Sequence, residues 1–151
     1  MRICTGRFQN SRETWNQHKT MTAIDTNRPG LVGLRVFVVE DEALILEWYE
    51  AILRDLGCEL AGRALSVTDA LNQIDRLEFD VALLDVHLAR TPVFPVAERI
   101  ASRGIPIVFV TGGQSDQLPS QWRQCRVLPK PFEPEQIAKA LEAIANVVSR
   151  G

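Results

Sequence analysis

Short apolar runs alternate with amphipathic segments along most of the chain, beginning at Leu34. Residues 35–39 begin with one arginine and continue as an unbroken run of β-branched and aromatic side chains. Such a run is typical of a strand buried on both faces. Residues 42–56 instead place apolar side chains at helical spacing, and Gly57 follows as a stop signal. This strand and this helix form a first β-α unit.

The same alternation continues to the end of the chain and predicts five β-α units in all. Parallel strands with right-handed helical crossovers leave few other arrangements than a sheet covered on both faces. The sequence therefore predicts a doubly wound α/β fold with a five-stranded parallel sheet. The further strands are expected at residues 59–65, 81–84, 105–110 and 126–128, and the further helices at 66–77, 96–103 and from 134 onward, with a poorly patterned piece at 114–122.

Residues 1–33 differ from the rest in being polar and aperiodic, with a loop signal at residues 27–30. We interpret them as a flexible N-terminal leader and residues 34–151 as one domain, because this length suits a single core. The leader holds five basic and two acidic residues of the chain's 17 and 19, which leaves 12 basic and 17 acidic residues for the domain. That acidic balance argues against a DNA-binding surface.

Neither a membrane segment nor a zinc site is indicated. No apolar stretch approaches the roughly 18 to 20 residues that span a bilayer, and the basic start lacks the apolar segment of a secretory signal. The three cysteines form no C-x-x-C pair and have no histidine at metal-ligand spacing. We expect a cytoplasmic protein that does not bind membranes.

Polar residues end the predicted strands: Glu40 and Asp41, Asp85, Thr111, and Lys130. Because ligands of such sheets bind outside the carboxyl ends of the strands, these side chains are expected to meet in one crevice. Clustered carboxylates repel one another unless a cation is bound, and an oxygen-only set suits Mg²⁺. The lysine and the hydroxyl are groups that recognise phosphoryl oxygens, and a central carboxylate can itself act as a nucleophile.

Four short motifs carry a resemblance to the receiver domains of two-component response regulators. They are V-V-E-D-E at residues 38–42, L-L-D at 83–85, V-T-G at 110–112 and L-P-K-P-F at 128–132. The resemblance covers residue 34 to about residue 150. It implies a flavodoxin-like sheet with strand order 2-1-3-4-5.

The resemblance also implies a role for each residue at the strand ends. Asp85 is then the phosphoacceptor, and the Mg²⁺ ligands are Glu40, Asp41, Asp85 and the backbone carbonyl of His87. Thr111 follows the phosphoryl group and Lys130 pairs with it. The bond between Lys130 and Pro131 is expected to be cis.

The sequence departs from the family pattern at three places. Val127 stands where many members have an aromatic switch residue, and the spacing from Asp85 to Thr111 is somewhat short. Residues 89–95 replace the usual glycine-containing loop after the phosphoacceptor. Residues 109–113, F-V-T-G-G, resemble the signature of the FATGUY subfamily of receivers, which tends to lack that aromatic.

The function implied is that of a single-domain response regulator that assists its own phosphorylation and dephosphorylation and is not otherwise an enzyme. The phosphoryl donor is a sensor histidine kinase or a histidine phosphotransfer protein, and the output is contact with an unidentified downstream protein. Only three residues follow the last predicted helix, so we expect no output domain. Alanines along that helix are compatible with a partner or a homodimer.

Two alternatives compete with this interpretation. A receiver-like module that binds a partner without being phosphorylated has the same fold. A haloacid-dehalogenase-like phosphatase also uses a strand-end aspartate with Mg²⁺, but it needs a second aspartate two residues later, where this chain has His87. Taken singly, Asp41 also suits a helix N-cap, Asp85 a turn and Lys130 a solvated loop.

Overall fold

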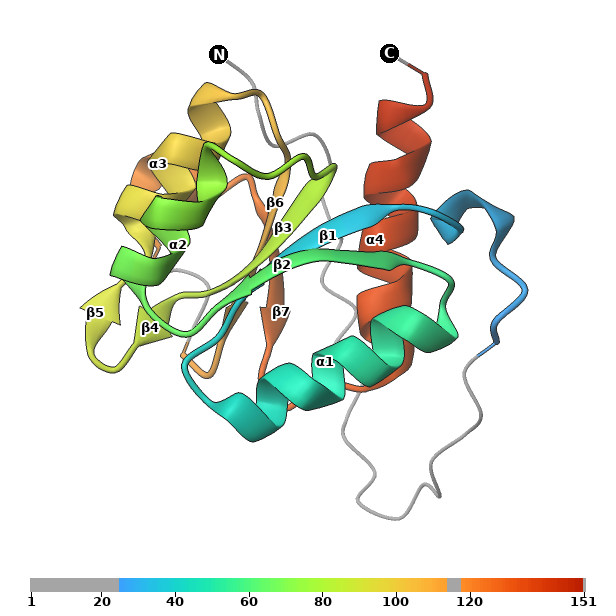
Figure 1. Ribbon diagram of the computed structural model, residues 1–151, viewed down its shortest axis with the longest axis horizontal. Helices are drawn as coiled ribbons and strands as arrows, with labels where there is room; N and C mark the ends of the chain where they lie inside the picture. The colour runs from blue at the N-terminus through green and yellow to red at the C-terminus, as the bar shows by residue number, and fades with distance from the viewer. Residues whose placement is uncertain (1–24, 114–117, 151) are drawn as a thin grey trace.

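A five-stranded parallel sheet forms the centre of the computed structural model, which describes residues 25–113 and 118–150 (Figure 1). The order of its strands is β2-β1-β3-β6-β7, and each neighbouring pair is parallel. This confirms the predicted fold and the 2-1-3-4-5 order. The strands are β1 (Arg35–Val39), β2 (Glu59–Ala64), β3 (Val81–Asp85), β6 (Ile107–Thr111) and β7 (Arg126–Pro129).

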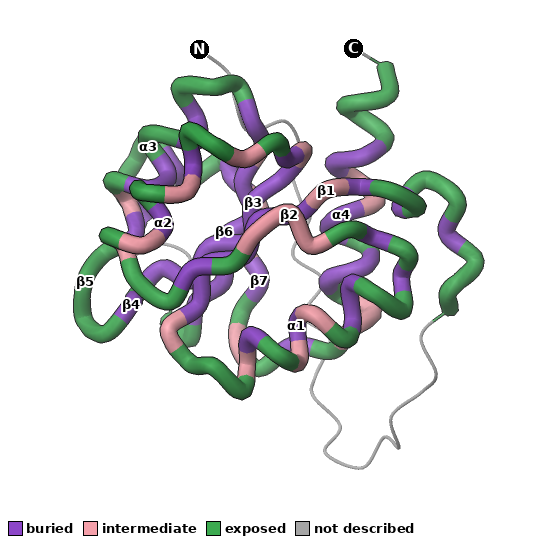
Figure 2. The backbone as a smooth tube through the Cα atoms, viewed as in Figure 1, coloured by how far each residue is buried: buried purple, intermediate pink, exposed green. Residues whose placement is uncertain are grey.

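Helices cover both faces of this sheet. On one face lie α1 (Ala43–Asp55) and α4 (Pro134–Val148), and on the other lie α2 (Val67–Ile74) and α3 (Phe94–Ser102) (Figure 1). The two faces hold separate apolar clusters, and side chains alternate between them along each central strand. The three central strands are therefore buried almost throughout, as Figure 2 shows, which explains their continuous apolar runs.

Side-chain hydrogen bonds cap the start of α2. The hydroxyl of Ser66 accepts a hydrogen bond of 3.1 Å from the Asp69 backbone N–H. The Asp69 carboxylate in turn accepts a 3.3 Å bond from the backbone N–H of Leu65. The Ser66 hydroxyl thus satisfies one N–H group that the helix itself cannot pair, and the Asp69 carboxylate ties the helix to the residue before its N-cap.

The structure adds two short pieces that the periodicity does not predict. After β3 comes a small antiparallel hairpin of β4 (His87–Leu88) and β5 (Thr91–Pro92). In the described part of the β6–β7 connection, the regular structure is a single 3₁₀ turn, η3 (Ser120–Trp122). All four predicted helices are therefore present as α-helices, and the described part of the fourth connection, where the sequence is poorly patterned, holds a 3₁₀ turn instead.

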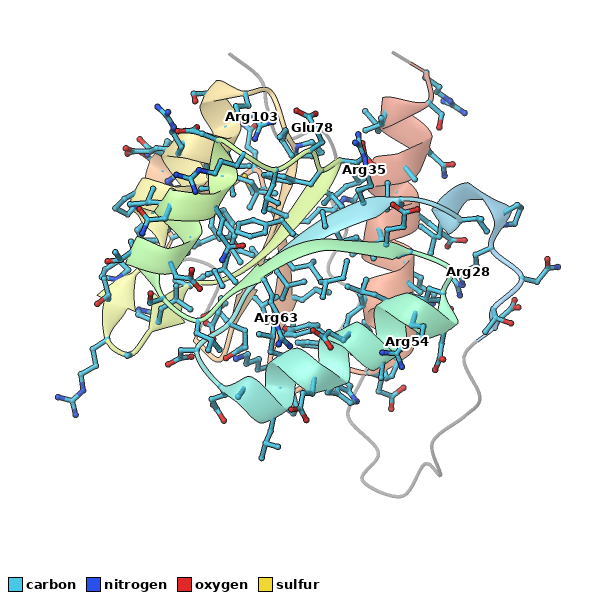
Figure 3. All side chains as sticks on the ribbon, in the orientation of Figure 1. Arg28, Arg35, Arg54, Arg63, Glu78 and Arg103 are labelled. Carbon is cyan, nitrogen blue, oxygen red and sulfur yellow. The ribbon has the colours of Figure 1, made fainter. Side chains whose placement is uncertain are left out.

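The last part of the predicted leader packs onto the domain. Pro29–Leu31 forms a 3₁₀ turn, η1, in which Leu31 is fully buried in the α1/α4 cluster. Arg28, labelled beside α4 in Figure 3, is 8% exposed and pairs with both Glu135 and Glu142 of that helix. The flexible leader over residues 1–24 lies outside the described residues and stays a prediction.

Three of the four alanines of α4 face the interior of the domain, and Ala143 is partly exposed. Ala138, Ala140 and Ala145 are buried in the α1/α4 cluster, so their small side chains let the helix pack closely on the sheet. They give no support to a partner surface or a homodimer on that stripe. Within the described residues, no helix is long and apolar enough to cross a membrane.

Candidate functional site

Three carboxylates meet at the carboxyl ends of β1 and β3. Glu40 and Asp41 directly follow β1, and Asp85 is the last residue of β3, the neighbouring strand. One oxygen of each lies within 4.8 Å of the others. Glu40 is fully buried, Asp85 is 8% exposed, and Asp41 is intermediate. The predicted gathering of these residues at one sheet edge is confirmed.

Lys130 joins the carboxylates from the end of β7, the edge strand of the sheet. Its backbone N–H donates to the Thr111 carbonyl at 2.8 Å, which extends the β6–β7 ladder by one residue. Its ammonium donates to Asp85 Oδ2 at 2.9 Å and to Glu40 Oε2 at 3.1 Å. The bond between Lys130 and Pro131 is cis, as expected.

Backbone donors occupy the remaining oxygens of the two buried carboxylates. The His87 backbone N–H donates to Asp85 Oδ1 at 3.2 Å, and the Glu42 backbone N–H donates to Glu40 Oε1 at 3.1 Å. Both carboxylates are therefore held in one orientation from two sides. His87 itself is exposed, and the part its carbonyl plays in metal binding stays a prediction.

Asp41 is tied to the hairpin that follows β3. Its Oδ2 accepts a 2.9 Å hydrogen bond from the backbone N–H of Ala89. Ala89 and Arg90 form the two-residue turn of this hairpin, with φ of 47° and 70°. The sequence gives no signal for this turn, because left-handed turns of this kind normally carry glycine, asparagine or aspartate.

Thr111 is 4% exposed at the end of β6. Its Oγ1 accepts a hydrogen bond of 3.0 Å from the backbone N–H of Gly113. The hydroxyl thus fixes the first turn of the β6–β7 connection, as the following two glycines suggest from the sequence.

The pKa values of Glu40 and Lys130 are shifted by their surroundings. Burial raises the pKa of Glu40 to about 7, against the lowering effect of the Glu42 N–H and of Lys130 and with a raising effect from Asp85. Burial lowers the pKa of Lys130, but its hydrogen bonds to Asp85 and Glu40 outweigh this, so that the pKa of Lys130 is raised overall. One ammonium is therefore shared between two carboxylates while Asp41 stands close by.

This donor set fits a hard divalent cation. Three carboxylate oxygens within 4.8 Å of one another are suited to Mg²⁺, which binds oxygen ligands and keeps several waters. A cation would also offset the repulsion that helps to raise the pKa of Glu40. Glu40, Asp41 and Asp85 are the side chains that would hold it.

The fold and these strand-end groups define a flavodoxin-like α/β domain with an acidic pocket at its switch point. The model of the response regulator receiver domain family matches residues 36–142. The chain therefore belongs to that family, whose members are phosphoacceptor modules of two-component signalling. The acidic triad Glu40, Asp41 and Asp85 is typical of the magnesium site of receivers.

Similarities to individual proteins support this family assignment. The transcriptional regulatory protein PdtaR of Mycobacterium tuberculosis is 31% identical over 131 residues, which are 86% of this chain and 64% of PdtaR. The chain thus spans less than two thirds of that relative. The solution structure of SdrG from Sphingomonas melonis Fr1 is 40% identical, has a TM-score of 0.66, and is matched over 74% of this chain and 96% of SdrG.

A more distant structure shows the same fold. TrrA from Thermotoga maritima, solved in complex with Mg²⁺ and BeF, is 20% identical with a TM-score of 0.65 over 74% of this chain and 98% of that one. A second SdrG structure represents its BeF₃-activated conformation. None of these comparisons names the FATGUY subfamily, and that assignment stays a prediction.

Proposed function

We propose that the chain accepts a phosphoryl group on Asp85 from a phosphohistidine of a sensor histidine kinase or histidine phosphotransfer protein. The observation that carries this proposal is the position of Asp85, which lies within hydrogen-bond distance of Lys130 and within 4.8 Å of two further carboxylates. Such an arrangement combines a nucleophile, a fixed cation and a place for a metal ion. The phosphorylated chain would then signal by contact with a downstream protein.

In this proposal, an Asp85 carboxylate oxygen forms a bond to phosphorus while the bond between phosphorus and the partner's imidazole nitrogen breaks. The electron pair of the broken bond leaves with that nitrogen. Mg²⁺, held by Glu40, Asp41, Asp85 and the His87 carbonyl, would supply positive charge for the phosphoryl oxygens. Lys130 supplies further charge from the other side, so that the chain contributes mainly positioning and electrostatic stabilisation.

Two hydrogen-bond donors orient the Asp85 carboxylate for its attack on phosphorus. Lys130 holds Oδ2 and the His87 N–H holds Oδ1, so the carboxylate plane is fixed before a partner arrives. After transfer, the new group carries about two negative charges close to Lys130 and the end of β6. Thr111, through its hydroxyl, is the group proposed to move toward that charge and so to change the surface near β6 and β7.

Incubation with acetyl phosphate and Mg²⁺, followed by intact-mass measurement, tests this function. The wild-type chain should gain one acid-labile phosphoryl group, and the Asp85→Asn variant should gain none. Asp55→Asn is a matched control, since Asp55 is an exposed carboxylate at the end of α1, and it should be labelled like wild type. Labelling of Asp85→Asn at the wild-type level would show that Asp85 is not the acceptor.

The same measurement distinguishes the phosphoacceptor function from the alternative of an interaction module that works without phosphorylation. That alternative predicts no adduct on any variant, and no effect of beryllofluoride, a phosphoryl mimic, on the folded chain. Beryllofluoride binding that requires both Mg²⁺ and Asp85 would instead favour the phosphoacceptor function.

A further inference from the structure

Val127 occupies the position at which many receivers carry an aromatic switch residue, and valine supplies no aromatic ring there. Val127 lies on β7 directly beside Phe109 of β6 and is only partly buried. Both pack in the apolar cluster on the α2/α3 face of the sheet. Trp122, from η3 in the β6–β7 connection, packs in the same cluster.

Trp122 continues a ladder of aromatic rings that crosses this face. Phe94, at the start of α3, meets Phe109 edge to face at 6.1 Å between ring centroids. Phe109 meets Trp122 at 5.7 Å and 70°. The large indole therefore supplies, from the connection, aromatic packing that Val127 does not supply from β7.

The indole N–H of Trp122 is buried without a hydrogen bond in the described part of the chain. The residue as a whole is 6% exposed. A buried donor without an acceptor is costly, because it has lost its water without gaining a replacement. A rearrangement that gives Nε1 an acceptor is therefore favoured by more than the packing change alone.

Thr111 connects this indole to the phosphoacceptor. Thr111 follows Phe109 by two residues on β6 and so lies on the same face of the sheet. Its hydroxyl holds the Gly113 N–H at the start of the connection that carries Trp122. A movement of Thr111 would thus act on Trp122 through β6 and the ring of Phe109, which Trp122 contacts.

We propose that Trp122 is the positioning residue that passes the phosphorylation signal from Thr111 into the β6–β7 connection, in place of an aromatic residue at position 127. This proposal rests on the proposed function, since it needs a phosphoryl group on Asp85 to move Thr111. In the activated state, the indole leaves its resting contact with Phe109, and Nε1–H gains an acceptor. The connection around η3 then presents a different surface to the downstream protein.

A chain with Trp122 as its only tryptophan tests the proposal. In the Trp15→Phe/Trp48→Phe background, Mg²⁺ and beryllofluoride should shift the emission of Trp122 to longer wavelength, because its Nε1 becomes hydrogen-bonded. Asp85→Asn should abolish the shift. Thr111→Ala should lose most of the shift when it is compared with wild type at beryllofluoride concentrations at which ¹⁹F NMR shows both proteins to be saturated.

The Trp122→Phe variant separates a signalling role of Trp122 from a purely structural one, because only a signalling role predicts a change in beryllofluoride affinity. Phenylalanine keeps an aromatic ring against Phe109 but removes the N–H that gains a partner on activation. Beryllofluoride affinity should then fall by about fivefold, the lower end of ordinary coupling between sites. The Trp15→Phe/Trp48→Phe background, measured in the same way, should bind like wild type.

Two results would overturn the coupling and leave the proposed function standing. One is bound beryllofluoride with unchanged Trp122 emission, and the other is a Trp122→Phe variant that loses stability but keeps wild-type affinity. Failure of the wild-type chain to bind beryllofluoride or to be phosphorylated would instead overturn both proposals.

Discussion

The ammonium of Lys130 lies 2.9 Å from Asp85 Oδ2, and it lies 3.1 Å from Glu40 as well. One cation thus links the ends of β7, β3 and β1, strands that are separated in sequence by 45 and 90 residues at these contacts. Without it, two buried carboxylates would face each other with Asp41 close by. Like charges in such a pocket are destabilising unless another cation takes the place of the ammonium.

Lys130→Ala should therefore make folding stability depend on Mg²⁺. In the presence of a chelator we expect a loss of about 1–3 kcal/mol, the usual cost of removing a partner from buried polar groups. Added Mg²⁺ should raise the melting temperature of the variant more than that of wild type. Lys139→Ala, which removes an exposed lysine of α4, is the control. Equal gains from Mg²⁺ in all three proteins would contradict the expected role of Lys130.

The segment before β1 should contribute measurably to stability. Leu31 is fully buried against α1 and α4, so Leu31→Ala should cost about 2–5 kcal/mol in the free energy of unfolding. The adjacent Val32 is 70% exposed, and Val32→Ala should stay within about 0.5 kcal/mol of wild type. Urea unfolding followed by circular dichroism measures both. If the two variants are equally stable, the packing of η1 onto the domain does not contribute to stability as expected.

The fold was predictable because each central strand can be recognised from its own residues. Strands buried on both faces need continuous apolar runs, and the predicted strand at residues 35–39 coincides with β1. The site was predictable for a related reason, since polar residues that end such strands must meet at one edge. Glu40, Asp85 and Lys130 do so within hydrogen-bond distance.

Other features depend on contacts that no local pattern encodes. Leu31 and Val32 are adjacent apolar residues, yet Leu31 is buried and Val32 is exposed, because the burial of Leu31 depends on helices that follow it in the chain. The turn at Ala89 and Arg90 lacks the usual turn residues. Trp122 lies in a poorly patterned segment, and its contact with the ring of Phe109 depends on how the chain packs.

The hairpin after β3 should be improved by glycine at its tip. Arg90 has a φ of 70°, a conformation that costs a side-chain-bearing residue about 1–2 kcal/mol. Arg90→Gly removes this strain but adds about 0.5–1 kcal/mol of chain entropy to the unfolded state. We expect a net stabilisation of up to about 1 kcal/mol by urea unfolding. Arg76→Gly, in the exposed turn after α2, should instead be neutral or destabilising, and a similar gain there would argue against strain at Arg90.

Acid should weaken the fold partly through Asp80. Its carboxylate accepts hydrogen bonds from the Arg35 backbone N–H at 2.9 Å and from the Arg35 guanidinium at 2.9 and 3.2 Å, which anchor the start of β1. The Arg35 side chain lowers the pKa of Asp80 below its ordinary value of 3.8. A lowered pKa means that the folded chain holds fewer protons than the unfolded chain, so this stability is fully present above pH 3.8 and is lost as the pH falls below it.

Asp80→Asn should accordingly be less stable than wild type at neutral pH, and the difference should shrink as the pH falls toward the lowered pKa of Asp80. Asparagine cannot form the ion pair with Arg35, and it has no proton to gain in acid. Unfolding in urea at a series of pH values from neutral to below 3.8 measures the difference. Asp55→Asn, on the exposed end of α1, is the control for the general loss of a carboxylate. A difference between Asp80→Asn and wild type that stays constant with pH would show that the Arg35 pair does not contribute through its charge.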